Sequence, residues 1–241
     1  QEGSFQFPFS IFKWGDAFTE GNSLHYSWSV FHDVQGLIDL MGGDKAFTRK
    51  LDSIFTLPPV FDDSYYGFVI HEIREMQIMD MGNYAHGNQP IQHMIYLYDY
   101  AGEPSKTQYW VREVMRRLYS DRPDGYCGDE DNGQTSAWYV FSALGFYPVT
   151  PALGQYAIGT PYFREVCLSM PEGKRFVIRA SDPSAPYIQS AQLNGKPWEK
   201  TYIDYETLRR GGSMTFTLGA KASSWGTHAS ARPYSFSRAN K

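Results

Sequence analysis

The apolar residues of this chain change their spacing near Pro148. Before this point they recur every three or four positions, as they do in amphipathic helices that bury one face. After it they stand in short runs separated by Gly, Pro, Asn and Asp, a pattern typical of β-strands joined by tight turns. We therefore expect a mainly α chain: helices in residues 1–150, an antiparallel β module in 151–220 and a polar tail in 221–241.

The helical part is expected to consist of helical hairpins. The predicted helices lie at 26–41, 44–55, 91–98, 110–118 and 135–144. Long loops fall on alternate connections, as in a partial (α/α)6 toroid, where such loops gather at one end and build the site. The connection 58–90 is especially long, and connections of that length inside a domain are usually functional.

The β module is expected to contain short strands with clear turn residues between them. They are predicted at 155–158, 165–170, 175–180, 188–193, 200–203 and 213–218. Asn194-Gly195 is a strong signal for a two-residue hairpin turn.

Composition excludes several classes of function. The formal net charge is −4 and no block of Lys or Arg occurs, which argues against nucleic acid as a partner. No apolar run is long enough to predict a membrane span. The first residues show no pattern of a signal peptide, and Cys127 and Cys167 lack the spacing of a metal or redox motif. Aromatic residues make up 17% of the chain, which permits sugar stacking but equally serves a core.

An acidic loop carries the most distinctive local pattern. Asp129, Glu130 and Asp131 lie between glycines and lead directly into a helix that contains Trp138. Carboxylates followed by aromatic side chains are typical of the wall of a carbohydrate site. The simpler interpretation is an acidic helix cap, and the motif alone slightly favours it.

Four separated motifs together resemble glycoside hydrolase family 92. They are Thr-Glu-Gly-Asn-Ser at 19–23, His-Asp-Val-Gln-Gly-Leu at 32–37, His-Gly-Asn-Gln-Pro at 86–90 and Gly-Asp-Glu-Asp-Asn-Gly-Gln-Thr-Ser-Ala-Trp-Tyr at 128–139. The resemblance implies an exo-acting, calcium-dependent α-mannosidase that inverts the anomeric centre. It also implies an N-terminal β-sandwich followed by an (α/α)6 barrel, of which this chain resembles the C-terminal part.

Inverting hydrolysis needs one carboxyl that donates a proton and one carboxylate that activates water. The resemblance implies that Glu20 is the acid and that Asp129 or Asp131 is the base. Aromatic neighbours such as Phe18 are expected to enclose Glu20 and to keep its proton available. The alternative for Glu20 is a favourable charge at a helix N-terminus. Glu130 is expected to point elsewhere.

Asn88 and Gln89 are the candidate calcium ligands, since calcium binds carboxylate, amide and backbone oxygens. In the family, calcium engages the 2- and 3-hydroxyls of the sugar. Related sequences often have Glu in place of Gln89, so this site would hold less negative charge. A polar turn before a helix that starts at Pro90 is an equally good interpretation.

Three further residues are candidate sugar contacts. His71 and Glu72 resemble a pair that binds the leaving-group sugar in α-1,2-specific members, and the alternative is a surface ion pair of little energetic value. His86 is the third. His25, His32 and His93 lie on helical faces and are expected to pack.

The leading functional hypothesis is therefore the C-terminal part of a periplasmic or secreted α-mannosidase that acts on mannose-containing glycans. A mannosyl-phosphate diesterase of the same family is an alternative, although its good leaving group would make Glu20 dispensable. A non-catalytic carbohydrate-binding or structural fragment is another. An incomplete barrel exposes apolar helix faces, so we expect either an N-terminal half or self-association to cover them.

Overall fold

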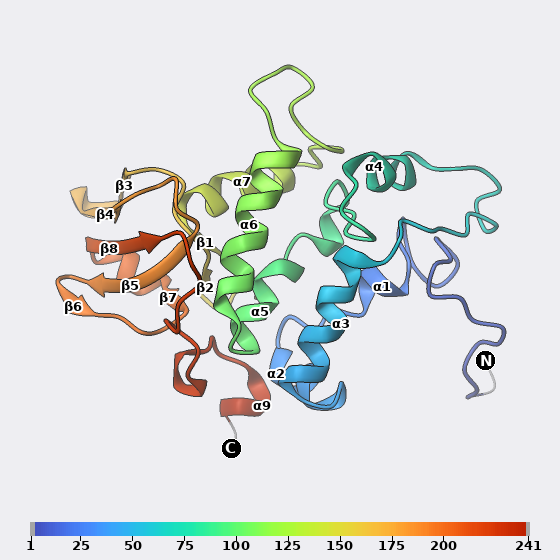
Figure 1. Cartoon of the computed structure of the whole chain (residues 1–241), viewed down its shortest axis with the longest axis horizontal. Coiled ribbons are helices and arrows are strands. Elements are labelled where there is room, and N and C mark those ends of the chain that lie inside the picture. Colours follow the sequence, from blue (N-terminus) through green and yellow to red (C-terminus); the bar gives the residue numbers. More distant parts are fainter. Residues whose placement is uncertain (1–2, 240–241) are drawn as a thin grey trace.

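The computed structural model describes residues 3–239 and places helices and strands in two neighbouring parts (Figure 1). The helical part contains α1 (Ser23–Tyr26), α2 (Val34–Leu40), α3 (Asp44–Thr56), α4 (His71–Met79), α5 (Leu97–Tyr100), α6 (Pro104–Leu118) and α7 (Gln134–Leu144). Two short 3-10 helices, η1 (Gln89–Ile91) and η2 (Met94–Tyr96), precede α5. None of the helices within residues 3–239 is long and apolar enough to cross a membrane.

The helices differ from the sequence prediction at four places, one of which is the start of α6 at Pro104 instead of residue 110. Of the helix expected at 26–41, only Tyr26 in α1 and residues 34–40 in α2 are helical. α2 begins where the Asp33 carboxylate accepts the amide of Gly36 at 3.0 Å and caps the helix. The segment 91–98 forms 3-10 turns and the start of α5 instead of one helix. The connection 58–90 contains α4, whose Ile73 and Met76 pack in a small core with Trp14.

Two sheets make up the β part. The smaller has the order β1-β2-β7, formed by β1 (Phe146–Tyr147), β2 (Gln155–Ile158) and β7 (Tyr202–Asp204). The larger has the order β3-β4-β8-β5-β6, formed by β3 (Glu165–Ser169), β4 (Arg175–Ala180), β8 (Gly212–Gly219), β5 (Tyr187–Leu193) and β6 (Lys196–Pro197).

The larger sheet is mixed, whereas the sequence predicted an antiparallel module. β4 and β8 run parallel, since the long connection 181–211 returns the chain to the same end of the sheet. β5 and β6 form the predicted hairpin, with Asn194 and Gly195 at φ values of 49° and 77° as a two-residue turn requires.

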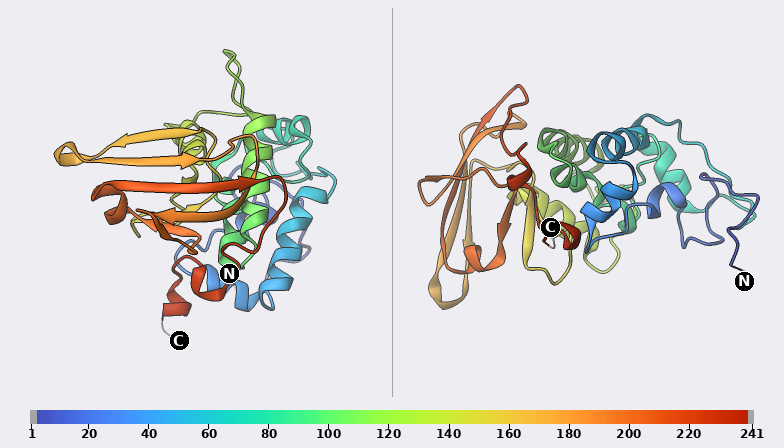
Figure 2. Two further views of the ribbon diagram at one scale, coloured as in Figure 1. Left: turned by 60° about the vertical axis from the view of Figure 1, so that its left-hand side comes forward. Right: turned by 90° about the horizontal axis from the view of Figure 1, so that it is seen from below.

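α6 and α7 join the two parts. Phe141 of α7 packs against both the helical core and the core of the β part. From α6, Arg112 donates a hydrogen bond to the Pro183 carbonyl at 2.8 Å, and the Gln108 side chain accepts the Ile188 amide at 3.0 Å. The larger sheet therefore lies beside α6, as both views of Figure 2 show.

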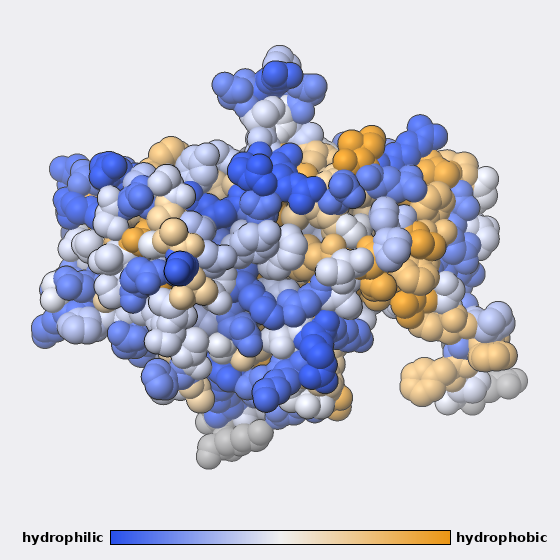
Figure 3. All heavy atoms as spheres, viewed as in Figure 1, coloured by the Kyte–Doolittle hydropathy of each residue, from blue (hydrophilic) through white to orange (hydrophobic). Residues whose placement is uncertain are grey.

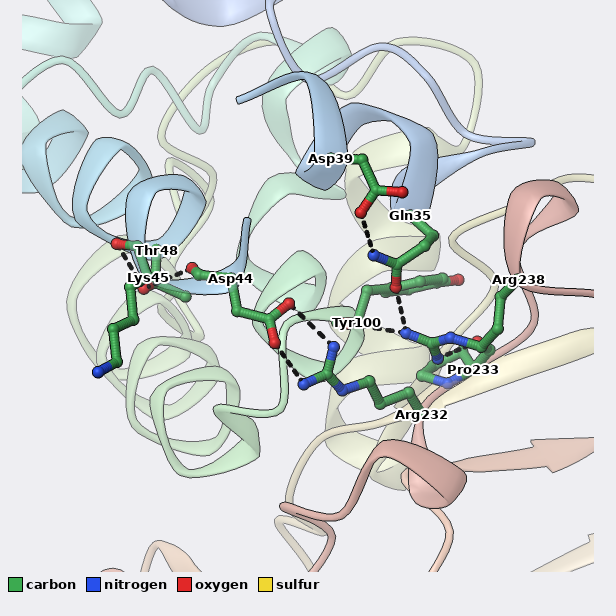
Figure 4. A network of polar contacts seen from close by, with 9 residues as sticks. All are labelled: Gln35, Asp39, Asp44, Lys45, Thr48, Tyr100, Arg232, Pro233 and Arg238. Carbon is green, nitrogen blue, oxygen red and sulfur yellow. Dashed lines mark hydrogen bonds and ion pairs between the residues drawn. The ribbon is translucent and has the colours of Figure 1, made fainter. Parts of the chain in front are cut away.

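Residues 221–239 pack against the molecule, although a polar tail was expected there. Arg232 forms a two-pronged ion pair with Asp44, at 2.7 and 2.9 Å, and Arg238 donates to the Gln35 side chain at 2.5 Å (Figure 4). Ser235 is buried, and its hydroxyl donates to the Asp33 carboxylate at 2.8 Å. This C-terminal segment fastens the β part to α2 and α3.

Asp33 is a centre of this attachment. Its carboxylate also accepts the backbone amide of Ser237 at 3.0 Å and the hydroxyl of the same residue at 2.5 Å. Burial acts to raise the pKa of Asp33, but the hydrogen bonds from Ser237, Ser235 and Gly36 outweigh it and hold that pKa well below its ordinary value. The carboxylate therefore stays charged and keeps both segments bound.

Large apolar side chains are exposed on the helical part. They include Val60 (49% exposed), Phe68 (64%) and Ile78 (83%). Figure 3 shows apolar surface gathered on the half of the molecule that carries α3 and α4. The described residues leave this surface uncovered.

Three buried histidines predict a pH-dependent stability. Burial lowers the pKa of His25 and His93 to about 4 and that of His86 to about 3, whereas an unfolded histidine titrates near 6.5. As the pH falls below about 6.5, the unfolded chain binds protons that the folded chain does not, so the free energy of unfolding decreases. Each histidine contributes at most about 1.4 kcal/mol per pH unit.

Urea unfolding measured between pH 7 and pH 5 tests this expectation. The free energy of unfolding should decline with pH, and His93→Gln should make the decline shallower. A decline that is equally steep in the variant would contradict the assignment. His32, which was expected to pack with the others, is exposed and is not included.

Candidate active site

Glu20 lies at the boundary of two cavities. The first cavity, of about 600 Å³, is lined by Glu20, Asn88, Gln89 and Asp131 together with an apolar wall that includes Tyr147. The second cavity, of about 510 Å³, is lined by Glu20, Tyr66, Phe68, Val69, Ile70, His71, Glu72 and Arg74. Segments that are distant in the sequence therefore meet around one residue, Glu20.

The backbone of Glu20 adopts a conformation that side chains rarely take. Its φ is 48°, in the left-handed region. The Glu20 amide donates to the Tyr66 hydroxyl at 3.0 Å, and the Asn88 side-chain amide donates to the Glu20 carbonyl. The Tyr26 hydroxyl holds the preceding carbonyl, that of Thr19, at 2.6 Å. These contacts fix a loop that would otherwise relax to a more common conformation.

The expected aromatic enclosure of Glu20 is not formed by residues 3–239. Glu20 is exposed, and Phe18 stacks on Tyr26 with ring centres 5.4 Å apart. Trp14 is fully buried and packs its ring against His25. The aromatic residues near Glu20 in the sequence thus support its loop instead of surrounding its carboxyl.

The acidic loop lies between α6 and α7, in the connection whose first part projects from the molecule in Figure 1. Asp131 has a φ of 52° and lines the first cavity together with Glu20. Glu130 turns back and accepts the Ser136 hydroxyl at 2.5 Å, the Gly133 amide at 2.7 Å and the Ser136 amide at 3.3 Å, so it bonds free N–H groups at the start of α7. These hydrogen bonds, with that from Ser136 largest, lower the pKa of Glu130. Within this one motif, Glu130 therefore bonds the start of α7, while Asp129 and Asp131 stay exposed.

Asp129 belongs to a different group, with His71 and Glu75 of α4. One ligand atom from each of the three lies within 4.8 Å of the others. His71 Nδ1 is 2.8 Å from Glu75 Oε1, and His71 Nε2 is 3.2 Å from Glu72 Oε1. The hydrogen bond to Glu75, followed by the charges of Glu72 and Glu75, raises the pKa of His71 against the opposing effect of burial. Glu75 was missed from the sequence, although its i+4 spacing from His71 on a helix places the two side chains together.

Glu72 is buried at the edge of the second cavity, with 8% of its surface exposed. Burial raises its pKa, and its Oε2 atom has no hydrogen-bond partner among the described residues. The neighbouring His71 opposes this rise in pKa. The unpartnered Oε2 atom is therefore available for a hydrogen bond to a ligand.

Asn88 and Gln89 connect the two carboxylate loops. The Asn88 amide donates to the Glu20 carbonyl, and the Gln89 amide donates to the Asp129 carbonyl at 3.2 Å. Their side-chain oxygens accept no hydrogen bond within residues 3–239, so both remain available to a ligand. Calcium binds oxygen ligands, including amide oxygens. The His71 group offers a nitrogen beside the carboxylates of Glu75 and Asp129, whereas the Asn88–Gln89 pair offers oxygens only. The Asn88–Gln89 pair therefore fits calcium.

His86 lies beneath the site and lines neither cavity. It is fully buried, and its ring nitrogens are 2.7 Å from the Tyr84 hydroxyl and 2.8 Å from the Tyr119 hydroxyl. Tyr119 in turn donates to the Thr135 carbonyl at 3.3 Å, and the Thr135 hydroxyl donates to the Asp129 carbonyl at 2.9 Å. In this structure His86 supports the acidic loop from below.

Proteins of one family resemble this chain in sequence and structure. Residues 1–220 match the sequence model of the glycosyl hydrolase family 92 catalytic domain. A solved family GH92 inverting mannosidase from Bacteroides thetaiotaomicron is 52% identical with a TM-score of 0.85, over 98% of this chain and 32% of that protein. A family GH92 α-mannosidase from the same bacterium, solved in complex with mannoimidazole, is 33% identical with a TM-score of 0.86, over 97% of this chain and 31% of that protein.

A curated relative is also similar. An uncharacterized secreted glycosidase from Arthroderma benhamiae is 30% identical over 203 residues, which are 82% of this chain and 23% of that protein. The chain thus spans about a third of the solved relatives and about a quarter of the curated one. Because the family model covers almost all of its residues, this chain belongs to glycosyl hydrolase family 92.

Proposed function

We propose that this chain carries the acid, the base and the calcium ligands of an exo-acting α-mannosidase that hydrolyses terminal α-1,2-linked mannose with inversion. The observation that supports this most is the position of Glu20, which shares one cavity with Asp131 and another with His71 and Glu72. A glycosidic oxygen at Glu20 would have one sugar in each cavity. The terminal mannose would occupy the first cavity and the leaving-group sugar the second.

The roles follow from the chemistry of inversion. Glu20 donates its proton to the glycosidic oxygen as the bond from that oxygen to the anomeric carbon breaks. Asp131 accepts a proton from the water that attacks the same carbon from the opposite face, and Asp129 orients that water. His71 and Glu72 bind hydroxyls of the leaving-group sugar. His86 is proposed to act on the sugar only through the acidic loop that it supports.

Asn88 and Gln89 would hold calcium through their side-chain oxygens. A bound calcium ion would supply a positive charge that binds adjacent sugar hydroxyls and favours a distorted ring. Residues 3–239 provide only part of a ligand set of six to eight oxygens, so sugar hydroxyls, water or other parts of the protein would supply the rest.

The proposal extends to partners and location. A mannose-containing glycan is the substrate, and the protein works in the periplasm or outside the cell. The exposed apolar surface of Val60, Phe68 and Ile78, on α4 and the connection before it, is covered by an N-terminal half or by a second copy. The presence of Glu20 favours a glycosidase over a mannosyl-phosphate diesterase, since phosphate leaves without protonation.

Release of mannose from an α-1,2-linked mannobiose tests the proposal. The chain is assayed alone and as a chimaera in which it replaces the matching third of the 52%-identical Bacteroides thetaiotaomicron mannosidase. We expect inversion, detected by NMR as the first-formed β-anomer. Binding of mannose without cleavage in both forms would support a non-catalytic carbohydrate-binding protein instead.

Removal of calcium is expected to abolish most of this activity. Chelation should lower kcat/KM at least about tenfold, and calcium should restore it better than magnesium, which demands a smaller and more regular site. Asn88→Ala should weaken calcium binding measured by calorimetry, while Asn132→Ala, in the exposed part of the acidic loop, serves as the control. Unchanged calcium affinity in Asn88→Ala would exclude it as a ligand.

A further inference from the structure

We infer that Tyr66 is a positioning residue for Glu20, an inference that rests on the proposed function. Its hydroxyl accepts the backbone N–H of Glu20 at 3.0 Å, across 46 positions of sequence. On the other side of the same residue, Asn88 donates to the Glu20 carbonyl. Tyr66 borders the second cavity and Asn88 borders the first, so the peptide of Glu20 is held from both.

The side chain of Glu20 has no such support of its own. Its carboxyl makes no hydrogen bond within residues 3–239 and Glu20 is exposed, so only the backbone holds the Cα–Cβ bond from which the carboxyl extends. That backbone is in the left-handed region, which is disfavoured for a residue with a Cβ atom. Without the hydroxyl of Tyr66, the loop can relax and turn the carboxyl away from the glycosidic oxygen.

The location of Tyr66 also links the acid to the leaving-group sugar. Tyr66 is half-buried, its ring contacts Tyr65 edge-on at 5.2 Å, and Phe68 lies 6.5 Å away. A sugar in the second cavity would contact the Tyr66 ring and restrict its motion. Occupation of that cavity would then hold the acid in place, whereas a substrate with a small leaving group would not use this support.

The experiment compares Tyr66→Phe with Tyr65→Phe as a matched control, in whichever form hydrolyses mannobiose. Tyr65 is an adjacent, exposed tyrosine with no hydrogen bond to Glu20. We expect Tyr66→Phe to lower kcat for mannobiose about tenfold, as the loss of one hydrogen bond implies, with KM unchanged. α-Mannosyl fluoride, whose leaving group needs little acid assistance, should be hydrolysed within about twofold of the original rate.

A double variant distinguishes a positioning role of Tyr66 from a general loss of structure at the site. When Glu20 is already Gln, Tyr66→Phe should cause no further loss on mannobiose, because the acid through which it acts is absent. Equal losses on mannobiose and fluoride, an additive loss in the double variant, or the same loss in Tyr65→Phe would each overturn the inference.

A second measurement does not depend on catalysis. Hydrogen exchange at the Glu20 amide should become faster in Tyr66→Phe and stay unchanged in Tyr65→Phe, since only Tyr66 accepts that N–H. If no form cleaves a mannoside, the proposed function fails, while this exchange still decides whether Tyr66 holds the Glu20 peptide. Unchanged exchange in Tyr66→Phe would refute that contact.

Discussion

Glu20→Gln is expected to lower kcat for an α-1,2-linked mannobiose by about 10²–10⁴-fold, the range typical for loss of a general acid. Gln keeps the size of the side chain but cannot transfer a proton to the glycosidic oxygen. The loss should be much smaller with α-mannosyl fluoride, because fluoride departs with little help from an acid. Steady-state rates with both substrates, in the active form of the protein, provide the measurement.

Glu165→Gln is the matched control for this variant. Glu165 is an exposed carboxylate of β3 that is paired with Arg179 at 2.8 Å and lines neither cavity. It should leave both rates unchanged. If Glu20→Gln slowed the two substrates equally, Glu20 would contribute to binding or folding, and another group would have to be the acid.

Asp131→Asn is expected to reduce kcat by a similar factor, about 10²–10⁴-fold, but on both substrates. Water must be activated whatever the leaving group is, so a better leaving group does not compensate for a missing base. Asp129→Asn should cause a smaller loss if it only orients the water. Two features support this order: Asp131 lines the first cavity, while Asp129 lies beside His71 and Glu75.

Asp121→Asn, in the same connection between α6 and α7, controls for general effects of removing a charge there. It lies on the exposed part of the loop and should have no effect on either substrate. A larger loss in Asp129→Asn than in Asp131→Asn would reverse the two roles. If both variants kept the original rate of hydrolysis of α-mannosyl fluoride, the catalytic base could not belong to this loop.

Local patterns in the sequence predicted the β part better than the helices. Its strands are short and bounded by turn residues such as Asn194-Gly195, whose conformation depends on the two residues themselves. The break between α1 and α2 depends on Asp33, which is bonded to Ser235 and Ser237 about 200 positions later. No periodicity within residues 26–41 contains that information.

The candidate site, too, could be predicted only in part from the sequence. Motifs predicted which loops carry polar groups, and the structure brings Glu20, Asn88, Gln89 and Asp131 to one cavity. The contact between Tyr66 and Glu20 could not be predicted, because it joins two irregular segments through one backbone amide. Burial could not be read from the sequence either: Glu20 was expected to be enclosed and is exposed, while Glu72 is the buried carboxyl.

The position of β8 has a consequence for synthesis on the ribosome. β8 lies between β4 and β5, so residues 175–193 emerge first as two strands that lack their shared neighbour. Asp33, at the start of α2, likewise gains its hydrogen bonds to Ser235 and Ser237 only after these residues have been synthesised. Pairing of such distant segments is slow, and unpaired strand edges attract other chains in the meantime. Residues 212–237 therefore complete the fold last. Nascent chains in which these residues have not yet been synthesised are the form most prone to aggregation.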